Sequence, residues 1–123
     1  ALGLPSATEP QLLAAEASEE TVAAVRRVLA TELLRGEASM TTVARRLGTS
    51  SRSLQRRLQA SGTTFQAELD GVRRALAQRL MAEPGASAKA VAFSLGFSEM
   101  SAFTRAFRRW TGQTPTAYAR ATS

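Results

Sequence analysis

One pattern of residues occurs twice in this chain, and the repeat constrains the fold more than any other feature of the sequence. Each copy has a serine suited to cap a helix, a short segment with apolar residues at helical spacing, a glycine, and a second serine that opens another helix. At an offset of 48, Val43, Ala44, Leu47, Gly48 and Ser50 match Val91, Ala92, Leu95, Gly96 and Ser98. At an offset of 49, Leu54, Arg56 and Leu58 match Phe103, Arg105 and Phe107. The repeat predicts two copies of one helix-turn-helix unit.

The second copy lies within residues 87–118. Ser87 is a candidate cap, and Gly96 supplies a turn position where a positive φ causes no side-chain strain. Ser98 and Glu99 are expected to open a second helix over about residues 99–111. Its aromatic residues at i, i+4 and i+7 form one stripe suited to burial: Phe103, Phe107 and Trp110. A separate polar stripe carries Ser101, Thr104, Arg105 and Arg108. A helix of this kind suits the reading helix of a helix-turn-helix unit.

The first copy has the same design with different side chains. Ser39 is expected to cap its first helix, Gly48 to make the turn, and Ser50 to cap a second helix over about residues 51–60. The outer face of that second helix carries residues at i, i+3, i+4 and i+7: Arg52, Gln55, Arg56 and Gln59. A face of this composition is usually only solvated. Because it recurs in register with two glycine turns, we interpret it as a binding face.

The second copy also resembles the C-terminal signature of the AraC/XylS family of bacterial transcription regulators. The family pattern is met by Ala92, Gly96, Phe97, Ser98, Ser101, Phe103, Arg105, Phe107, Gly112 and Pro115. The resemblance implies a DNA-binding domain in which two helix-turn-helix units are joined by one linker helix. Met100 stands where relatives commonly carry a polar residue.

The rest of the chain completes an all-α fold of seven expected helices. Residues 1–17, with two prolines and no steady period, are interpreted as a linker or disordered tail. The first subdomain is expected over 18–62, opening with a helix from Ser18 to about Leu34 that closes the bundle or, alternatively, forms a dimer interface. A linker helix over 63–83 and a second subdomain over 84–123 follow. Thr114 and Pro115 are expected to start the last helix.

The linker helix has a core-facing stripe and a length that bears on function. The stripe consists of Phe65, Leu69, Val72, Leu76 and Leu80. About 18 residues at a rise of roughly 1.5 Å make a rod of about 27 Å. Half-sites in successive major grooves are about 34 Å apart. Either the outer helices supply the difference or the DNA bends, which costs a few kcal/mol.

Charge is distributed unevenly along the chain. Residues 1–35 hold five Glu and three Arg, whereas residues 36–123 hold thirteen basic and five acidic residues. Arginine provides fifteen of the sixteen cations, and its guanidinium forks onto phosphate and guanine edges. The later part of the chain is therefore expected to bind a polyanion.

Composition argues against an enzyme. The chain has no Cys and no His, which removes the commonest nucleophiles, general bases and metal ligands, and we expect no cofactor and no metal. Relatives that transfer alkyl groups use a cysteine. No apolar run approaches the ~20 residues that span a bilayer. We expect a bacterial cytoplasmic, nucleoid-associated protein without a membrane partner.

Candidate contacts follow from the two reading helices. The residues expected to reach base edges are Arg52, Gln55 and Arg56 in the first unit, and Met100, Ser101, Thr104 and Arg105 in the second. The residues expected to contact phosphates are Ser39, Arg57, Ser87, Ser98, Arg108 and Arg109. The alternative for Arg105 is a structural ion pair with Glu99.

The sequence therefore predicts sequence-specific binding to double-stranded DNA by a monomer that inserts helices 51–60 and 99–111 into successive major grooves. The alternative is a helical interaction module that contacts RNA polymerase. Many AraC/XylS relatives carry an effector-binding domain ahead of this region. Residues 1–17 are too short for one, so a DNA-binding fragment or a stand-alone domain is expected.

Overall fold

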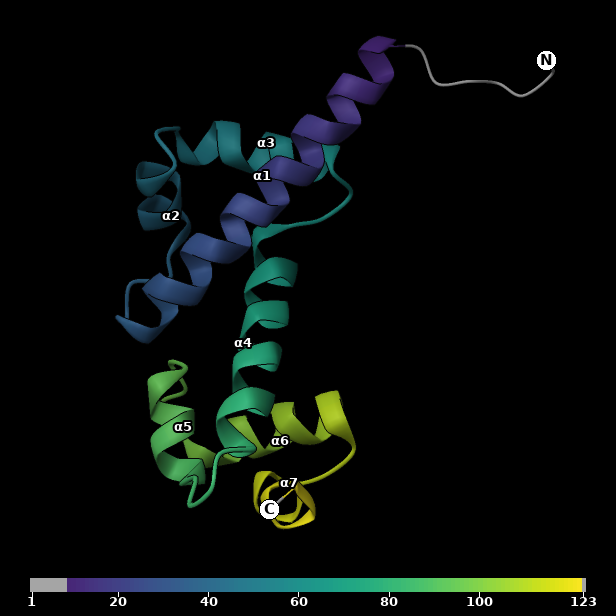
Figure 1. Cartoon of the computed structure of the whole chain (residues 1–123). Helices are drawn as coiled ribbons and strands as arrows, with labels where there is room; N and C mark the ends of the chain where they lie inside the picture. The colour runs from purple at the N-terminus through teal and green to yellow at the C-terminus, as the bar shows by residue number, and fades with distance from the viewer. Residues whose placement is uncertain (1–8, 123) are drawn as a thin grey trace, which may run out of the picture.

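The computed structural model describes residues 9–122, with the surroundings of individual side chains from residue 19 to residue 122. Within that range the chain forms α1 (Glu9–Leu34), α2 (Met40–Arg46), α3 (Ser51–Ala60), α4 (Phe65–Met81), α5 (Ala88–Ser94), α6 (Met100–Thr111) and α7 (Pro115–Thr122). Figure 1 shows α1, α2 and α3 gathered toward one end of α4, and α5, α6 and α7 at the other. The expected all-α fold, with two helix-turn-helix subdomains joined by a linker helix, is confirmed. No helix in the described part of the chain has the length and apolarity needed to cross a membrane.

The first helix begins earlier than expected. It starts at Glu9 instead of Ser18, so residues 9–17 are helical and only residues 1–8 of the expected tail lie outside the described residues. Residues 11–17 are Gln, Leu, Ala and Glu, which have high helix propensity even without a regular apolar period. Pro10 falls in the first turn, where its missing N–H removes no intrahelical hydrogen bond.

The turn chemistry of the two units agrees with the repeat. Ser39, Ser50 and Ser87 each cap a helix by accepting a backbone N–H three residues ahead. Gly48 and Gly96 have φ values of +71° and +88°, which residues with a side chain adopt only under strain. The boundaries expected for α3 and the start of α7 are also found, whereas α4 runs from Phe65 to Met81, inside the expected 63–83. Thr64 and Thr114 accept the first-turn N–H groups of Ala67 and Ala117.

The linker helix α4 is buried on two sides, not along one stripe. Phe65, Leu69 and Val72 are buried as expected, but Leu76 and Leu80 are only partly buried. Ala77 and Met81 are buried in their place. At about 100° per residue these two lie about 120–160° around the helix from Phe65. The buried side rotates along α4 because its two halves pack against different subdomains.

A buried carboxylate joins α4 to α1. Glu68 accepts hydrogen bonds from Arg26 Nε at 2.6 Å and from the hydroxyl of Thr63 at 2.7 Å. Burial raises the pKa of Glu68, but the hydrogen bonds from Arg26 and Thr63, together with the charge of Arg26, outweigh burial and hold that pKa below its usual value of 4.5. Charged Glu68 therefore stabilises the contact between α1 and α4.

We predict that Glu68→Gln lowers the free energy of unfolding by about 1–2 kcal/mol near neutral pH, because the charged acceptor is lost. Since the pKa of Glu68 is lower in the folded chain, its contribution is fully present above the usual value of 4.5 and is lost as pH falls through the folded pKa. Urea denaturation at pH 7 and pH 3 measures the difference between wild type and variant. That difference should shrink at pH 3, whereas an equal difference at both pH values contradicts the assignment. Glu83→Gln, at an exposed acid in the α4–α5 loop, is the matched control.

Candidate nucleic-acid interface

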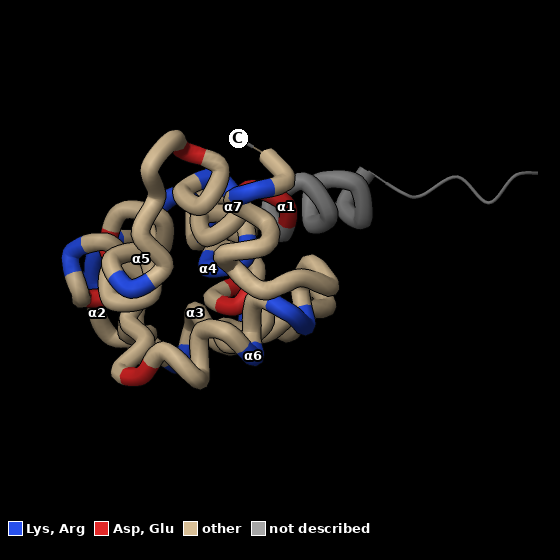
Figure 2. Tube along the Cα trace, turned by 90° about the horizontal axis from the view of Figure 1, so that it is seen from below, with Lys and Arg blue, Asp and Glu red and all other residues tan. Residues whose placement is uncertain are grey.

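The two expected reading helices lie on the same side of α4. In Figure 1, α3 and α6 both run across α4, near opposite ends of it. Figure 2 views the molecule from below, along α4, and shows α3 and α6 on one side of α4 with α1 and α7 on the other. One surface of the molecule therefore carries both helices.

Burial fixes which face of α6 turns outward. Phe103 and Phe107 are fully buried and Trp110 nearly so. Their rings pack with those of neighbouring elements: the centroids of Phe97 and Phe103 are 5.4 Å apart, and those of Phe107 and Tyr118 are 5.1 Å apart. Tyr118 of α7 thus closes the core over Phe107. On the opposite face Ser101, Arg105 and Arg108 are exposed, and Thr104 at its edge is half-buried.

Burial also fixes which face of α3 turns outward. Leu54 and Leu58 are buried against the first subdomain, which leaves Arg52, Gln55 and Arg56 exposed on the other face. None of the ion pairs within the described residues includes Arg52, Arg56, Arg105 or Arg108. The alternative ion pair of Arg105 with Glu99 is therefore not formed. These four cations remain available to an external anion.

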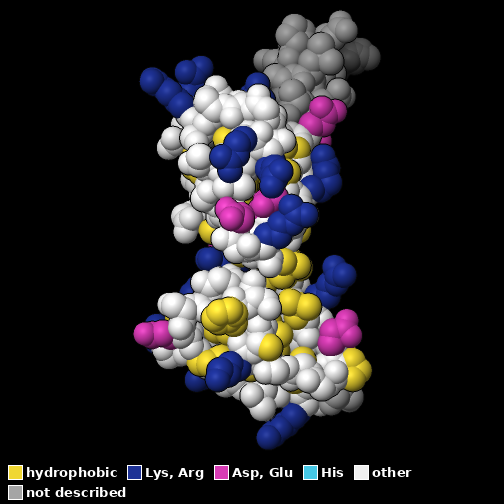
Figure 3. Space-filling model, turned by 90° about the vertical axis from the view of Figure 1, so that its left-hand side faces the viewer, with side chains coloured by type: hydrophobic (Ala, Val, Ile, Leu, Met, Phe, Trp, Pro, Cys, Tyr) yellow, Lys and Arg dark blue, Asp and Glu magenta, His cyan; other side chains and the backbone are white. Residues whose placement is uncertain are grey.

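Cations on a neighbouring side of the molecule are arranged differently. Figure 3 shows the side that carries α2 and α5, where positive and negative side chains intermingle in the upper part and hydrophobic side chains lie in the lower part. In the first subdomain the buried carboxylate of Glu32 pairs with Arg46 at 3.2 Å and with Arg35 at 3.6 Å. Internal pairing makes these cations weaker candidates for binding a polyanion than those of α3 and α6.

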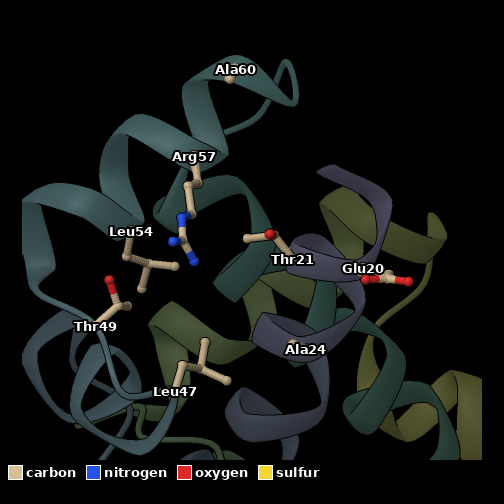
Figure 4. Close-up of a pocket in the computed structure, with 8 residues that line it drawn as sticks. All are labelled: Glu20, Thr21, Ala24, Leu47, Thr49, Leu54, Arg57 and Ala60. Atoms are coloured by element: carbon tan, nitrogen blue, oxygen red, sulfur yellow. The ribbon is translucent and has the colours of Figure 1, made fainter. Parts of the chain in front are cut away.

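Two of the arginines expected to contact phosphates point away from the outer faces of their helices. Arg57 lines a hollow of about 510 Å³ between α1, α3 and the α2–α3 turn. Figure 4 shows its guanidinium directed into that hollow, between Leu54 and Thr21. Arg109 donates to Asp70 of α4 at 3.4 Å. Of the three expected phosphate-binding arginines, Arg108 is the one that shares the outer face of its helix with the base-reading candidates.

The expected cap at Ser98 is wrong. The N-cap position of α6 is Glu99, which makes no side-chain capping bond, and Ser98 is exposed. The turn after Gly96 is one residue longer than the turn after Gly48, which is why the repeat offset changes from 48 to 49. Phe97 of this turn packs near Trp110, with ring centroids 6.4 Å apart.

Two polar residues of α4 that the sequence analysis did not single out contact the second unit. Asp70 bonds to the end of α6 and Arg73 to the α5–α6 turn. At the repeat offset of 48 they correspond to Val22 and Val25 of α1. The repeat therefore has two apolar residues in its first copy where its second copy has a charged pair. This difference between the copies is the sequence feature that could have pointed to Asp70 and Arg73.

Two helix-turn-helix units with uncompensated arginines on one side define a DNA-binding domain of the helix-turn-helix class. The model of the family described as "Helix-turn-helix domain" matches residues 43–121. The chain belongs to this family and, as its sequence signature implied, to the AraC/XylS type of transcription regulator.

Known regulators are similar over most of the chain. The HTH-type transcriptional regulator VirS of Mycobacterium tuberculosis is 41% identical over 112 residues, which cover 89% of this chain and 32% of that protein. The ornithine utilization regulator of Pseudomonas aeruginosa is 47% identical over 75 residues, covering 61% of this chain and 22% of that protein. The chain spans about a third or less of the length of these curated relatives. A crystal structure of a DNA-binding transcriptional dual regulator from Escherichia coli K-12 superimposes with a TM-score of 0.68 at 29% identity, over 80% of this chain and 91% of that one.

The different roles of Ser50 and Ser98 give a matched test. Ser50→Ala should lower the free energy of unfolding by about 1 kcal/mol, because the bond to the backbone N–H of Ser53 at 3.1 Å is lost. Ser98→Ala should change it by less than about 0.5 kcal/mol, as at an ordinary surface position. Chemical denaturation of both variants measures the pair of values, and equal losses would show that Ser98 caps α6 after all.

Proposed function

We propose that this chain is the DNA-binding part of a transcription regulator and that it inserts α3 and α6 into successive major grooves on one face of the duplex. The observation that carries the proposal is the placement of two uncompensated arginine-bearing helices on one side of α4. Membership of the helix-turn-helix family supports the same conclusion. Because one chain supplies both helices, we propose that it binds as a monomer and without a cofactor, in a bacterial cytoplasm.

Base recognition falls to the outer faces of the two helices. In α3 we propose Arg52, Gln55 and Arg56, since arginine forks onto guanine and glutamine onto adenine. In α6 we propose Met100, Ser101, Thr104 and Arg105. Met100 is exposed at the first turn of α6 and offers an apolar contact to a thymine methyl.

Phosphate contacts would set the register of both helices without reading sequence. Arg108 is the principal candidate because it is exposed and has no ion pair among the described residues. The proposed set also includes Ser39, Arg57, Ser87, Ser98 and Arg109. Ser98, which does not cap α6, has its hydroxyl available to a phosphate oxygen, whereas Arg57 and Arg109 would have to leave their present positions.

The length of α4 can be compared with the distance between two successive major grooves. Its 17 residues give a rod of about 26 Å at roughly 1.5 Å per residue. This is shorter than the separation of about 34 Å between successive major grooves. We propose that the difference is supplied by the packing offset of α3 and α6 from α4 or by a bend of the duplex, which costs a few kcal/mol.

Selection of bound sites from random duplex DNA by the purified chain tests the proposed function. We expect recovery of two short boxes with centres about one helical turn apart, 10–10.5 base pairs. Recovery of a single box, or no enrichment, contradicts insertion of both helices.

Arg105→Ala and Arg108→Ala should have different effects. We expect Arg105→Ala to cost about 1–3 kcal/mol on the selected site and to relax preference at one base pair. Arg108→Ala should weaken binding to selected and random DNA alike and lower the salt slope by about one. Fluorescence anisotropy at several salt concentrations measures both effects. Arg27→Ala, which removes an exposed arginine from α1, is the control and should have little effect. Equal losses for Arg105→Ala on selected and random DNA would contradict base reading.

Contact with RNA polymerase is a second candidate role. Phe93 on α5 is 82% exposed, an unusual position for a large aromatic side chain. If such a contact were the main function, any binding to duplex DNA would change little with salt, in contrast to the steep decline that phosphate contacts produce.

A further inference from the structure

Arg73 attaches α4 to the turn that precedes α6. Its Nε donates to the carbonyl oxygen of Leu95 at 3.2 Å, and its guanidinium carbon lies 5.3 Å from the centre of the Phe97 ring. Gly96 lies between these residues, and a Cβ placed on it would be 3.4 Å from Nη2 of Arg73. One side chain thus contacts three consecutive residues of the turn, and it does so from the linker helix.

Asp70 attaches α4 to the other end of α6. Its Oδ2 accepts a hydrogen bond from Nε1 of Trp110 at 3.3 Å, and its Oδ1 accepts from Nη2 of Arg109 at 3.4 Å. Trp110 is buried, so its indole N–H needs a partner of this kind. Asp70 and Arg73 are three residues apart and share one side of α4. Together they hold α6 at its beginning and at its end, which fixes the direction of that helix relative to α4.

The opposite attachment of α4 is equally polar. Glu68, two residues before Asp70 and therefore about 200° around the helix, binds Arg26 of the first subdomain. Side-chain hydrogen bonds thus join α4 to α1 on one side and to α6 and the turn before it on another. Rotation of either subdomain about α4 would break at least one of them.

The pair of charged residues is not needed to build a helix-turn-helix unit. In the first unit the corresponding positions of α1 are Val22 and Val25, and Val25 is fully buried. Neighbouring positions keep their apolar character in both units, since Leu29 and Leu33 correspond to the buried Ala77 and Met81. At these two matched positions, directional hydrogen bonds from α4 to the second unit stand where α1 offers apolar side chains to the first unit. Such bonds specify an angle more narrowly than apolar packing does.

We propose that Asp70 and Arg73 are positioning residues that set the angle between the two reading helices and thereby the spacing between boxes that the chain accepts. The inference rests on the proposed function, because it assumes that α3 and α6 enter two grooves of one duplex at the same time. Neither side chain needs to contact DNA for this role. One added base pair moves a half-site by about 3.4 Å along the duplex and rotates it by about 35°. A rigid connection cannot follow that change, whereas a loosened one can.

The test measures affinity on duplexes that carry the two selected boxes at the selected spacing and at spacings changed by one and two base pairs. Wild type should lose about tenfold in affinity for a change of one base pair, comparable to a mismatched position. Arg73→Ala and Asp70→Asn should lose much less than wild type on the altered spacings, so that their spacing profiles are flat. Arg73→Lys, which keeps a donor for the carbonyl of Leu95, should restore part of the discrimination.

Two controls separate positioning from damage to the fold. Arg74→Ala removes the neighbouring exposed arginine and should leave the spacing profile sharp. On a duplex with only the box read by α6, Arg73→Ala and Asp70→Asn should bind as wild type does, since each unit remains intact. Asp70→Asn keeps the shape of the side chain but loses its charge and one of the two oxygens that accept from Arg109 and Trp110, which provides a second variant should Arg73→Ala fail to fold.

The possible failures are distinguishable. If wild type binds all spacings equally, two-groove binding is contradicted and the inference falls with it. If wild type binds tightly only at the selected spacing, and both folded variants show the same preference for that spacing, the proposed function stands and the role of Asp70 and Arg73 is overturned.

Discussion

The structure depends on one helix that packs against both subdomains at once. The buried side of α4 turns from Phe65 and Leu69 in its first half to Ala77 and Met81 in its second, so one helix packs against both subdomains. Without this change of buried side along α4, the helix would pack against one subdomain only, and the two units would be free to orient independently. With it, α3 and α6 occupy defined positions on one side of a rod. The proposed mode of DNA binding needs that rigidity more than it needs any single base contact.

Both reading helices carry unpaired arginines on the surface that they share. Three arginines elsewhere are paired with acids, since Glu32 binds Arg35 and Arg46 and Glu68 binds Arg26. Arg52, Arg56, Arg105 and Arg108 form no ion pair within the described residues. Because exposed cations repel one another, leaving them unpaired on two helices of the same side favours binding of a polyanion at that surface. The chain's net charge of +6 matters less than this distribution.

Local features of this fold could be predicted from sequence, and contacts between distant residues could not. The caps Ser39, Ser50 and Ser87 and the turns at Gly48 and Gly96 depend on a few neighbouring residues, so their patterns are visible in the chain. Ser98 was misassigned because one extra residue in its turn moves the cap position to Glu99, and only the observed start of α6 at Met100 shows this shift. The bonds of Glu68, Asp70 and Arg73 join segments that no local pattern relates. Engagement of Arg57 and Arg109 away from the reading faces likewise required the structure.

Hydroxyl-radical footprinting of the wild-type complex tests the central claim most directly, because it maps protein against the sugars of each strand. Rigid two-groove binding predicts two protected patches with centres about 10 base pairs apart, both on the same face of the duplex. A single protected patch, or two patches on opposite faces, would show that α3 and α6 do not engage one duplex together.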